Sequence, residues 1–210
     1  MITLYGFPRS GNTLKVRIAL CLLSLPFEES MPSHGEHKRP PFTELNPLGQ
    51  VPVLVDDGVI LRDSQAILVY LAAAYRPGEW DGVAPAERGS IAQWMSFAAN
   101  ELQHGPNALR RIVQFDAPLD KRVASNATDQ ALEILERHLS SRLWLESGRM
   151  TIADMACAPY VALAPQGGVN LEPFAAIRSW LGRIEAASNF PSHPDWTRQP
   201  IADSPAPPPA

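Results

Sequence analysis

The chain has 210 residues, of which 45% are hydrophobic and 19% are charged, and its formal net charge is −4. This length allows one large or two modest domains with a proper core. The mild acidity argues against a nucleic-acid partner, because no basic surface is available to displace counterions. The first residues show no signal-peptide pattern, and no apolar run approaches the ~18 residues of a membrane span. We therefore expect a cytoplasmic protein without a membrane partner.

Residues 1–78 alternate between strand-like and helix-like patterns. The helix predicted over 13–23 has apolar residues at i, i+3, i+4 and i+7 on one face and more on a second face, so it should be buried on most sides. The expected elements are a strand at 2–5, this helix, a strand at 26–30, a polar loop, a hairpin around Asp57-Gly58 and a helix capped by Asp63 or Ser64. This order predicts a thioredoxin-like α/β domain.

Strand patterns stop after a Gly- and Pro-containing linker at 79–86. Residues 87–188 show only helical spacing and predict an all-helical second domain. The first expected helix runs from Pro85 to Gly105, and a second contains Leu132, Leu135, Leu139 and Leu143. A third begins at the capping box Thr151-Ile152-Ala153-Asp154 and extends to Ala164, with a kink at Pro159. A fourth contains Ile177, Leu181 and Ile184. The proline-rich segment 189–210 is predicted to be a disordered tail.

Neither cysteine nor histidine shows the spacing of a metal site. Cys21 and Cys157 lie far apart among small and apolar neighbours, which indicates two reduced core cysteines. The five histidines form no zinc pattern with them. We therefore expect no metal.

The dipeptide Val51-Pro52 begins a predicted strand. A proline there cannot donate to a strand ladder, so it tolerates only an edge or end position. A cis proline at this place in a thioredoxin-like domain exposes the N–H and C=O of the preceding residue, which can pair with an extended peptide. The flanking N-P-L-G-Q and the Asp63-Ser64 helix start favour this interpretation over a plain strand-initiating proline.

Two further features point to a small anionic peptide as the ligand. Asp63-Ser64 opens a helix, where free N–H groups and a hydroxyl suit a carboxylate and Asp63 suits an ammonium. That combination fits an α-amino-acid head group, and it is compatible with ordinary N-capping. His37-Lys38, in the loop before Asn46-Pro47, is a plausible partner for a second carboxylate beside the backbone clamp.

Ser10 lies at the turn between the first strand and the first helix. As a helix cap it would accept a backbone N–H from Thr13; as a functional group it would donate to a substrate thiolate. Lowering a thiol pKa by ~2 units takes about 2.7 kcal/mol. One hydroxyl bond to an anion supplies roughly 1.5–3 kcal/mol, and the helix N-terminus adds up to ~1 kcal/mol. The amide of Asn12 is an alternative donor, whereas no His/Asp pair supports Ser10 as a nucleophile.

Together these motifs resemble those of a bacterial cytosolic glutathione S-transferase. The matching stretches are Y-G-F-P-R-S-G-N-x-x-K-V-R, G-E-H-K-R-P-P-F-x-x-L-N-P-L-G-Q-V-P-V-L, D-S-Q-A-I-L-V-Y-L and T-I-A-D. They occur in the family's order over about 180 residues. The Gly11-Asn12 pattern is nearest to the phi, theta and nu-like groups, and differs from the beta group, which has cysteine at this position.

The resemblance implies residue roles, with glutathione as co-substrate and a small electrophile as its partner. Ser10, or Asn12, would activate the thiol. The glutathione-binding residues would be His37 and Lys38 for the glycine carboxylate, Val51 with cis Pro52 and Gln50 for the cysteinyl backbone, and Asp63 and Ser64 for the γ-glutamyl group. The family usually forms homodimers. Asp63 replaces a commoner glutamate, and its shorter side chain is expected to loosen the contact with the ammonium group. Leu48 stands where relatives often place a phenylalanine that inserts into the partner subunit, so the dimer contact is expected to be weaker.

The electrophile pocket is expected between the two domains. Its candidate residues are Phe7, Asn100, Glu101, His104, Asn107 and Arg111. Thiol transfer to an alkyl or aryl electrophile is the leading hypothesis. Glutathione-dependent reduction of disulfides or peroxides, and a non-catalytic binding or regulatory module, are the alternatives.

Overall fold

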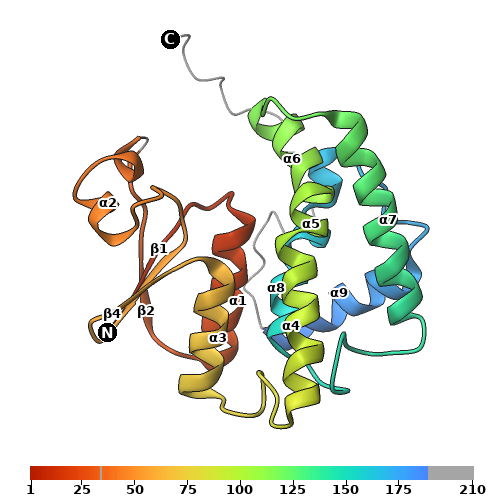
Figure 1. The fold of residues 1–210 in the computed structure, drawn as a ribbon, viewed down its shortest axis with the longest axis horizontal. Coiled ribbons are helices and arrows are strands. Elements are labelled where there is room, and N and C mark those ends of the chain that lie inside the picture. Colours follow the sequence, from red (N-terminus) through yellow and green to blue (C-terminus); the bar gives the residue numbers. More distant parts are fainter. Residues whose placement is uncertain (34, 189–210) are drawn as a thin grey trace.

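In the computed structural model, which describes residues 1–33 and 35–188, the first part of the chain forms a four-stranded mixed sheet (Figure 1). The strands are β1 (Ile2–Tyr5), β2 (Phe27–Ser30), β3 (Val53–Asp56) and β4 (Val59–Arg62). Their spatial order is β2-β1-β3-β4, with β1 parallel to β2 and antiparallel to β3. The predicted thioredoxin-like order of elements is confirmed.

Helices α1 (Gly11–Leu23) and α3 (Ser64–Tyr75) pack together between the sheet and the helical part of the molecule (Figure 1). Alternate residues of β1 are buried, so Leu4 opposes Leu54 of β3 in the core. As expected, α1 is buried on most sides, and every residue from Thr13 to Leu20 is buried. Because α1 contacts both the sheet domain and the helical domain, its N-terminus lies where the two domains meet.

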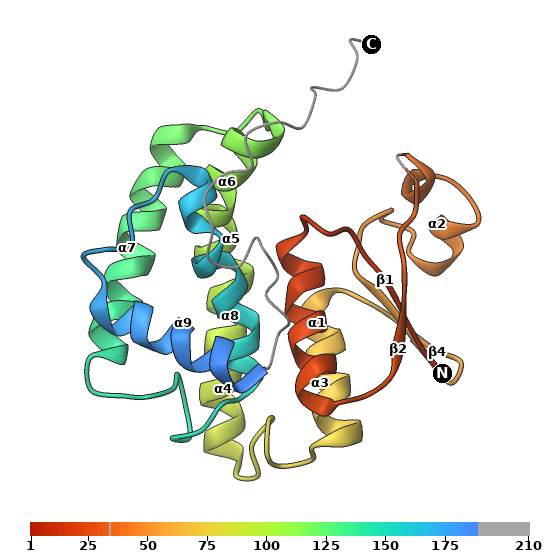
Figure 2. The ribbon, with the colours of Figure 1, turned by 180° about the vertical axis from the view of Figure 1, so that it is seen from behind.

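The second part of the chain is helical, as predicted. Its helices are α4 (Pro85–Ala99), α5 (Glu101–His104), α6 (Pro106–Phe115), α7 (Lys121–Leu139), α8 (Ile152–Ala162) and α9 (Ala175–Ser188), with a 3₁₀ turn η2 (Ala164–Gly167). Helix α8 is buried along its whole length and packs against α1, α3, α4 and α9 (Figure 2). No helix in the described ranges is long and apolar enough to cross a bilayer.

Several predicted boundaries are wrong for identifiable reasons. The helix expected from Pro85 to Gly105 is interrupted at Asn100, and Pro106 then begins α6, which was not predicted. A proline can end one helix and can also occupy the first turn of the next. Gly105-Pro106 therefore marks both the end of α5 and the start of α6. Helix α7 ends at Leu139, leaving Leu143 62% exposed beyond it.

Three further points concern loops and termini. The polar loop before β3 contains a 3₁₀ turn, η1 (Glu36–Lys38), and a short helix, α2 (Phe42–Leu45), neither of which has an apolar period long enough to predict. Of the two cysteines, Cys157 is buried but Cys21 is only partly buried. The predicted disordered tail, 189–210, lies outside the described residues.

The predicted capping box is present at the start of α8. The side chain of Thr151 accepts a hydrogen bond from the Ala153 N–H at 3.3 Å, and Asp154 Oδ2 accepts one from the Thr151 N–H at 2.9 Å. Asp154 is fully buried, and its Oδ1 accepts bonds from Trp180 Nε1 at 2.8 Å and from the Leu145 N–H at 3.0 Å. One carboxylate thus joins the start of α8, the segment before it and α9.

Candidate functional site

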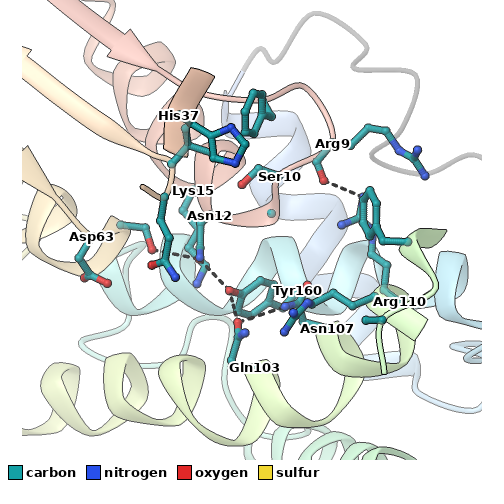
Figure 3. Close-up of a pocket in the computed structure, with 18 of the residues that line it drawn as sticks. Arg9, Ser10, Asn12, Lys15, His37, Asp63, Gln103, Asn107, Arg110 and Tyr160 are labelled. Carbon is teal, nitrogen blue, oxygen red and sulfur yellow. Dashed lines mark hydrogen bonds between the residues drawn. The ribbon is translucent and has the colours of Figure 1, made fainter. Parts of the chain in front are cut away.

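A cleft of about 950 Å³ lies between the sheet domain and the helical domain (Figure 3). It is bordered by the turn after β1, the first turns of α1, the η1 loop, the segment before β3, the start of α3, and helices α6 and α8. The predicted residues that line it are Phe7, Ser10, Asn12, His37, Lys38, Gln50, Val51, Asp63, Ser64, Asn107 and Arg111. The fold therefore brings the motifs of the first domain to one cavity.

Ser10 is the N-cap of α1, as expected. Its backbone is extended, and its Oγ accepts a hydrogen bond from the Thr13 N–H at 3.2 Å. The hydroxyl proton is not needed for that contact, so Ser10 retains a donor for the cleft. The two readings of Ser10, helix cap and thiolate donor, are thus compatible in this geometry.

The side chain of Asn12 belongs to a hydrogen-bond network between the domains. Its Oδ1 lies 3.1 Å from Ser64 Oγ and 2.7 Å from the Tyr160 hydroxyl, and that hydroxyl is 2.5 Å from Gln103 Oε1. Burial raises the pKa of Tyr160, so it stays protonated at neutral pH. A hydroxyl has one proton, so Tyr160 donates to one of these amides and accepts an N–H from the other. The choice decides whether Asn12 turns an N–H or an oxygen toward the cleft.

Lys15 is a buried cation one turn further along α1. Its side chain is 1% exposed, and its Nζ lies 3.8 Å from the centroid of the Tyr160 ring. Burial lowers the pKa of Lys15 to about 7, against smaller opposing effects of Cys157 and Asp63. Among residues 1–33 and 35–188 it makes no ion pair, whereas Arg17, on the same helix, pairs with both oxygens of Glu29.

Replacing Lys15 by methionine is expected to stabilise the protein, and more so at low pH. The unfolded chain binds the lysine proton up to about pH 10, whereas the folded protein releases it above about pH 7, so the stability of the wild type rises with pH across this window. The gain from Lys15→Met should therefore be about 2.7 kcal/mol larger at pH 6 than at pH 9. Urea unfolding of both proteins at the two pH values measures this difference. A gain independent of pH would contradict a proton released on folding.

The segment before β3 presents an unused backbone edge to the cleft. The Val51-Pro52 peptide bond is cis, as expected, and the N–H and C=O of Val51 form no hydrogen bond with another described residue. Gly49 has φ +55°, and a Cβ there would lie 2.6 Å from the His37 carbonyl oxygen. Only glycine allows this close approach, which holds Val51 beside the His37-Lys38 loop.

Asp63 caps α3 in a backbone conformation that non-glycine residues rarely adopt. Its φ is +77°, and its Oδ1 accepts hydrogen bonds from the N–H groups of Gln65 and Ala66 at 2.9 and 3.1 Å. Such backbone strain is found mainly at functional sites. It leaves Oδ2 of an exposed carboxylate at the edge of the cleft, next to the buried hydroxyl of Ser64.

Three candidates for the electrophile pocket lie elsewhere. Asn100 and Glu101 line a separate groove with α4 and α7, because the break between α4 and α5 turns them away from the cleft. The ring of His104 bonds to the Asn100 carbonyl instead. No three His, Cys, Asp or Glu side chains of residues 1–33 and 35–188 form a group that could hold a metal ion.

The structure adds residues to the cleft that the sequence did not single out. They are Arg9, Lys15, Gln103, Arg110, Phe115 and Tyr160. A lysine within a helix predicted to be buried on most sides was a usable signal for Lys15. Arg9 lies in the turn before Ser10. The remaining four come from α5, α6 and α8, whose approach to Ser10 depends on how the two domains pack.

Comparisons with known proteins agree with this geometry. A family model described as the N-terminal domain of glutathione S-transferases matches residues 4–79. Glutathione S-transferase 3 of Zea mays is 31% identical, covering 99% of this chain and 96% of its own. The crystal structure of a possible glutathione S-transferase from Rhodopseudomonas palustris is 32% identical with a TM-score of 0.83, covering 94% and 99% of the two chains. A transferase from Phanerochaete chrysosporium, solved with oxidized glutathione, is 26% identical with a TM-score of 0.80, covering 90% and 93%.

Proposed function

Because the chain belongs to the glutathione S-transferase family, we propose that it joins the thiol sulfur of glutathione to a carbon atom of a small electrophile. The observation that supports this most strongly is the position of Ser10. Its hydroxyl lies at the N-terminus of α1 and opens onto the same cleft as the Val51 backbone and the Asp63-Ser64 pair. A thiolate held there would be stabilised by a hydrogen bond and by the helix dipole.

The other residues of the first domain fit the three parts of glutathione. The cysteinyl backbone pairs with the N–H and C=O of Val51, assisted by Pro52 and Gln50. The γ-glutamyl ammonium is held by Asp63 and its carboxylate by Ser64 and the N-terminus of α3. His37 and Lys38, which Gly49 brings close to Val51, bind the glycine carboxylate.

We favour Ser10 over Asn12 as the donor to sulfur. The Ser10 hydroxyl can donate to sulfur whichever way the neighbouring amides point. Asn12 can donate its N–H to sulfur only if the Tyr160 hydroxyl donates to the Asn12 amide oxygen. In the reaction the thiol releases its proton to water, the thiolate forms a carbon–sulfur bond, and an aryl halide loses its halide ion. The protein's part is to stabilise the thiolate and hold the two reactants together.

The direct test measures conjugation and binding separately. Glutathione and 1-chloro-2,4-dinitrobenzene, a neutral aryl halide, should give the thioether faster than the uncatalysed reaction, and calorimetry should detect glutathione binding. Bound glutathione without conjugation would support a binding module. Turnover of a disulfide but not of the aryl halide would support a reductase.

A charge-only substitution of Asp63 tests how glutathione is held. Asp63→Asn keeps an oxygen that can cap α3 but loses the negative charge, so the Kd for glutathione should rise about tenfold, or ~1.4 kcal/mol. Asp120→Asn is the matched control, because Asp120 caps α7 with the same pair of backbone bonds and lies outside the cleft. Equal Kd values for the two variants would remove Asp63 from the site.

A further inference from the structure

The wall of the cleft beyond Ser10 contains three arginines, Arg9, Arg110 and Arg111. Two of their guanidinium groups converge on one aromatic ring: the Cζ atoms of Arg9 and Arg110 lie 4.6 and 5.5 Å from the centroid of Phe115. Arg110 Nη2 also donates to the Arg9 carbonyl at 2.9 Å. Figure 3 shows Arg9 and Arg110 on one side of Ser10, with His37 and Asp63 on the other.

Side-chain amide oxygens hold the guanidinium groups of Arg9 and Arg110 in place. Arg9 Nη2 donates to Gln114 Oε1 at 2.7 Å, and Arg110 Nε donates to Gln166 Oε1 at 2.6 Å. Gln114 in turn donates to the Gln166 carbonyl. The amide oxygen of Gln114 orients the exposed guanidinium of Arg9 without cancelling its charge. The arrangement therefore concentrates positive charge on a wall made by the turn after β1 and by α6.

The acidic groups of the cleft do not offset this charge. Asp63 belongs to the glutathione end, and Asp116, the residue after α6, is the one carboxylate at the arginine end of the described cleft. Arg9 and Arg111 form no ion pair with any residue in 1–33 or 35–188, and both are exposed. Positive charges gathered in a cleft attract anionic ligands.

We propose that the electrophile of this enzyme carries a carboxylate, which Arg9 and Arg111 bind while Phe7 and Phe115 flank its carbon skeleton. This rests on the proposed function. Guanidinium groups suit planar carboxylates because they offer two parallel donors. Arg9, Arg111 and Ser10 line the same cleft, so a carboxylate held by the arginines leaves the rest of a small molecule in the cleft that Ser10 faces. Arg110 is buried, and it positions Arg9 by donating a hydrogen bond to the Arg9 carbonyl oxygen.

The test uses two glutathione conjugates that differ in one group. S-(4-carboxy-2-nitrophenyl)glutathione has a carboxylate on the ring, and S-(4-carbamoyl-2-nitrophenyl)glutathione has a neutral amide of nearly the same size. Calorimetry should show the acid binding at least tenfold more tightly to the wild type. This ratio should fall at least fivefold in Arg111→Gln and in Arg9→Gln. It should not change in Arg122→Gln, which removes an exposed arginine of α7 outside the cleft.

Equal affinity for the two conjugates, or a ratio that Arg111→Gln and Arg9→Gln leave unchanged, would overturn the proposal. The proposal would also fail if these variants bound glutathione itself with a higher Kd while the acid-to-amide affinity ratio stayed the same. The arginines would then bind glutathione and not the electrophile. The proposed function fails separately, if 1-chloro-2,4-dinitrobenzene is not conjugated, since conjugate binding requires no turnover. The corresponding substrates, 4-chloro-3-nitrobenzoate and its amide, should show the same preference in kcat/KM after correction for their uncatalysed rates.

Discussion

Ser10→Ala is expected to lower kcat/KM for 1-chloro-2,4-dinitrobenzene about 100-fold at pH 7, equivalent to ~2.7 kcal/mol. The variant removes the hydroxyl donor, so bound glutathione loses most of the stabilisation that keeps its sulfur ionised. The loss should shrink as the pH rises toward 9, because a thiol of pKa ~8.5 ionises there without help. The ultraviolet absorbance of bound thiolate, titrated against pH, should show a matching rise in the thiol pKa.

Two comparisons separate the donor role of Ser10 from its role as a helix cap. Ser10→Thr keeps both the cap and the hydroxyl, and should retain much of the activity. Asp120→Ala removes the cap of α7, which does not line the cleft, so it should lower stability but leave the thiol pKa unchanged. If Ser10→Ala had full activity at every pH while Asn12→Ala lost it, the assignment would move to Asn12.

Asp154→Ala is expected to lower the free energy of unfolding by about 4 kcal/mol. The substitution leaves the buried Trp180 Nε1 and the N–H groups of Leu145 and Thr151 without their acceptor. Burial is also the main cause that raises the pKa of Asp154, so this carboxyl has no compensating access to water. Urea unfolding followed by Trp fluorescence and circular dichroism measures the change.

Asp154→Asn and Asp129→Ala serve as companions to this prediction. Asparagine keeps one acceptor oxygen but turns an NH₂ toward the donors of Thr151, so its cost should be intermediate. Asp129 is an exposed acid of α7 that forms no ion pair within residues 1–33 and 35–188, and replacing it should change stability by no more than about 0.5 kcal/mol. A small effect of Asp154→Ala would contradict the role of this carboxylate as the junction of α8 and α9.

The sequence predicted those features whose physical causes are local. A short run of β-prone residues placed β1, and a Thr and an Asp three residues apart placed the capping box of α8, because both patterns depend on neighbours along the chain. The same is true of the Asp63 cap, whereas the cis bond before Pro52 was expected from the thioredoxin-like domain and not from a local pattern. Prediction from the sequence failed where two local signals conflict. One such place is Gly105-Pro106, where α5 ends and α6 begins.

By itself, then, the sequence determined the thioredoxin-like order of elements and the helical second domain. It also predicted the residues at the proposed glutathione end of the cleft, which all come from the first domain. Only the tertiary structure decided the other end. Tyr160 lies 148 residues from the Asn12 side chain it contacts, and Arg110 lies 101 residues from the Arg9 carbonyl. Such contacts depend on how α6 and α8 pack against α1, and no residue pattern along the chain encodes that packing angle. The proposed role of Ser10 thus rests on local motifs, while the proposed preference for an anionic electrophile rests on the packing of two domains.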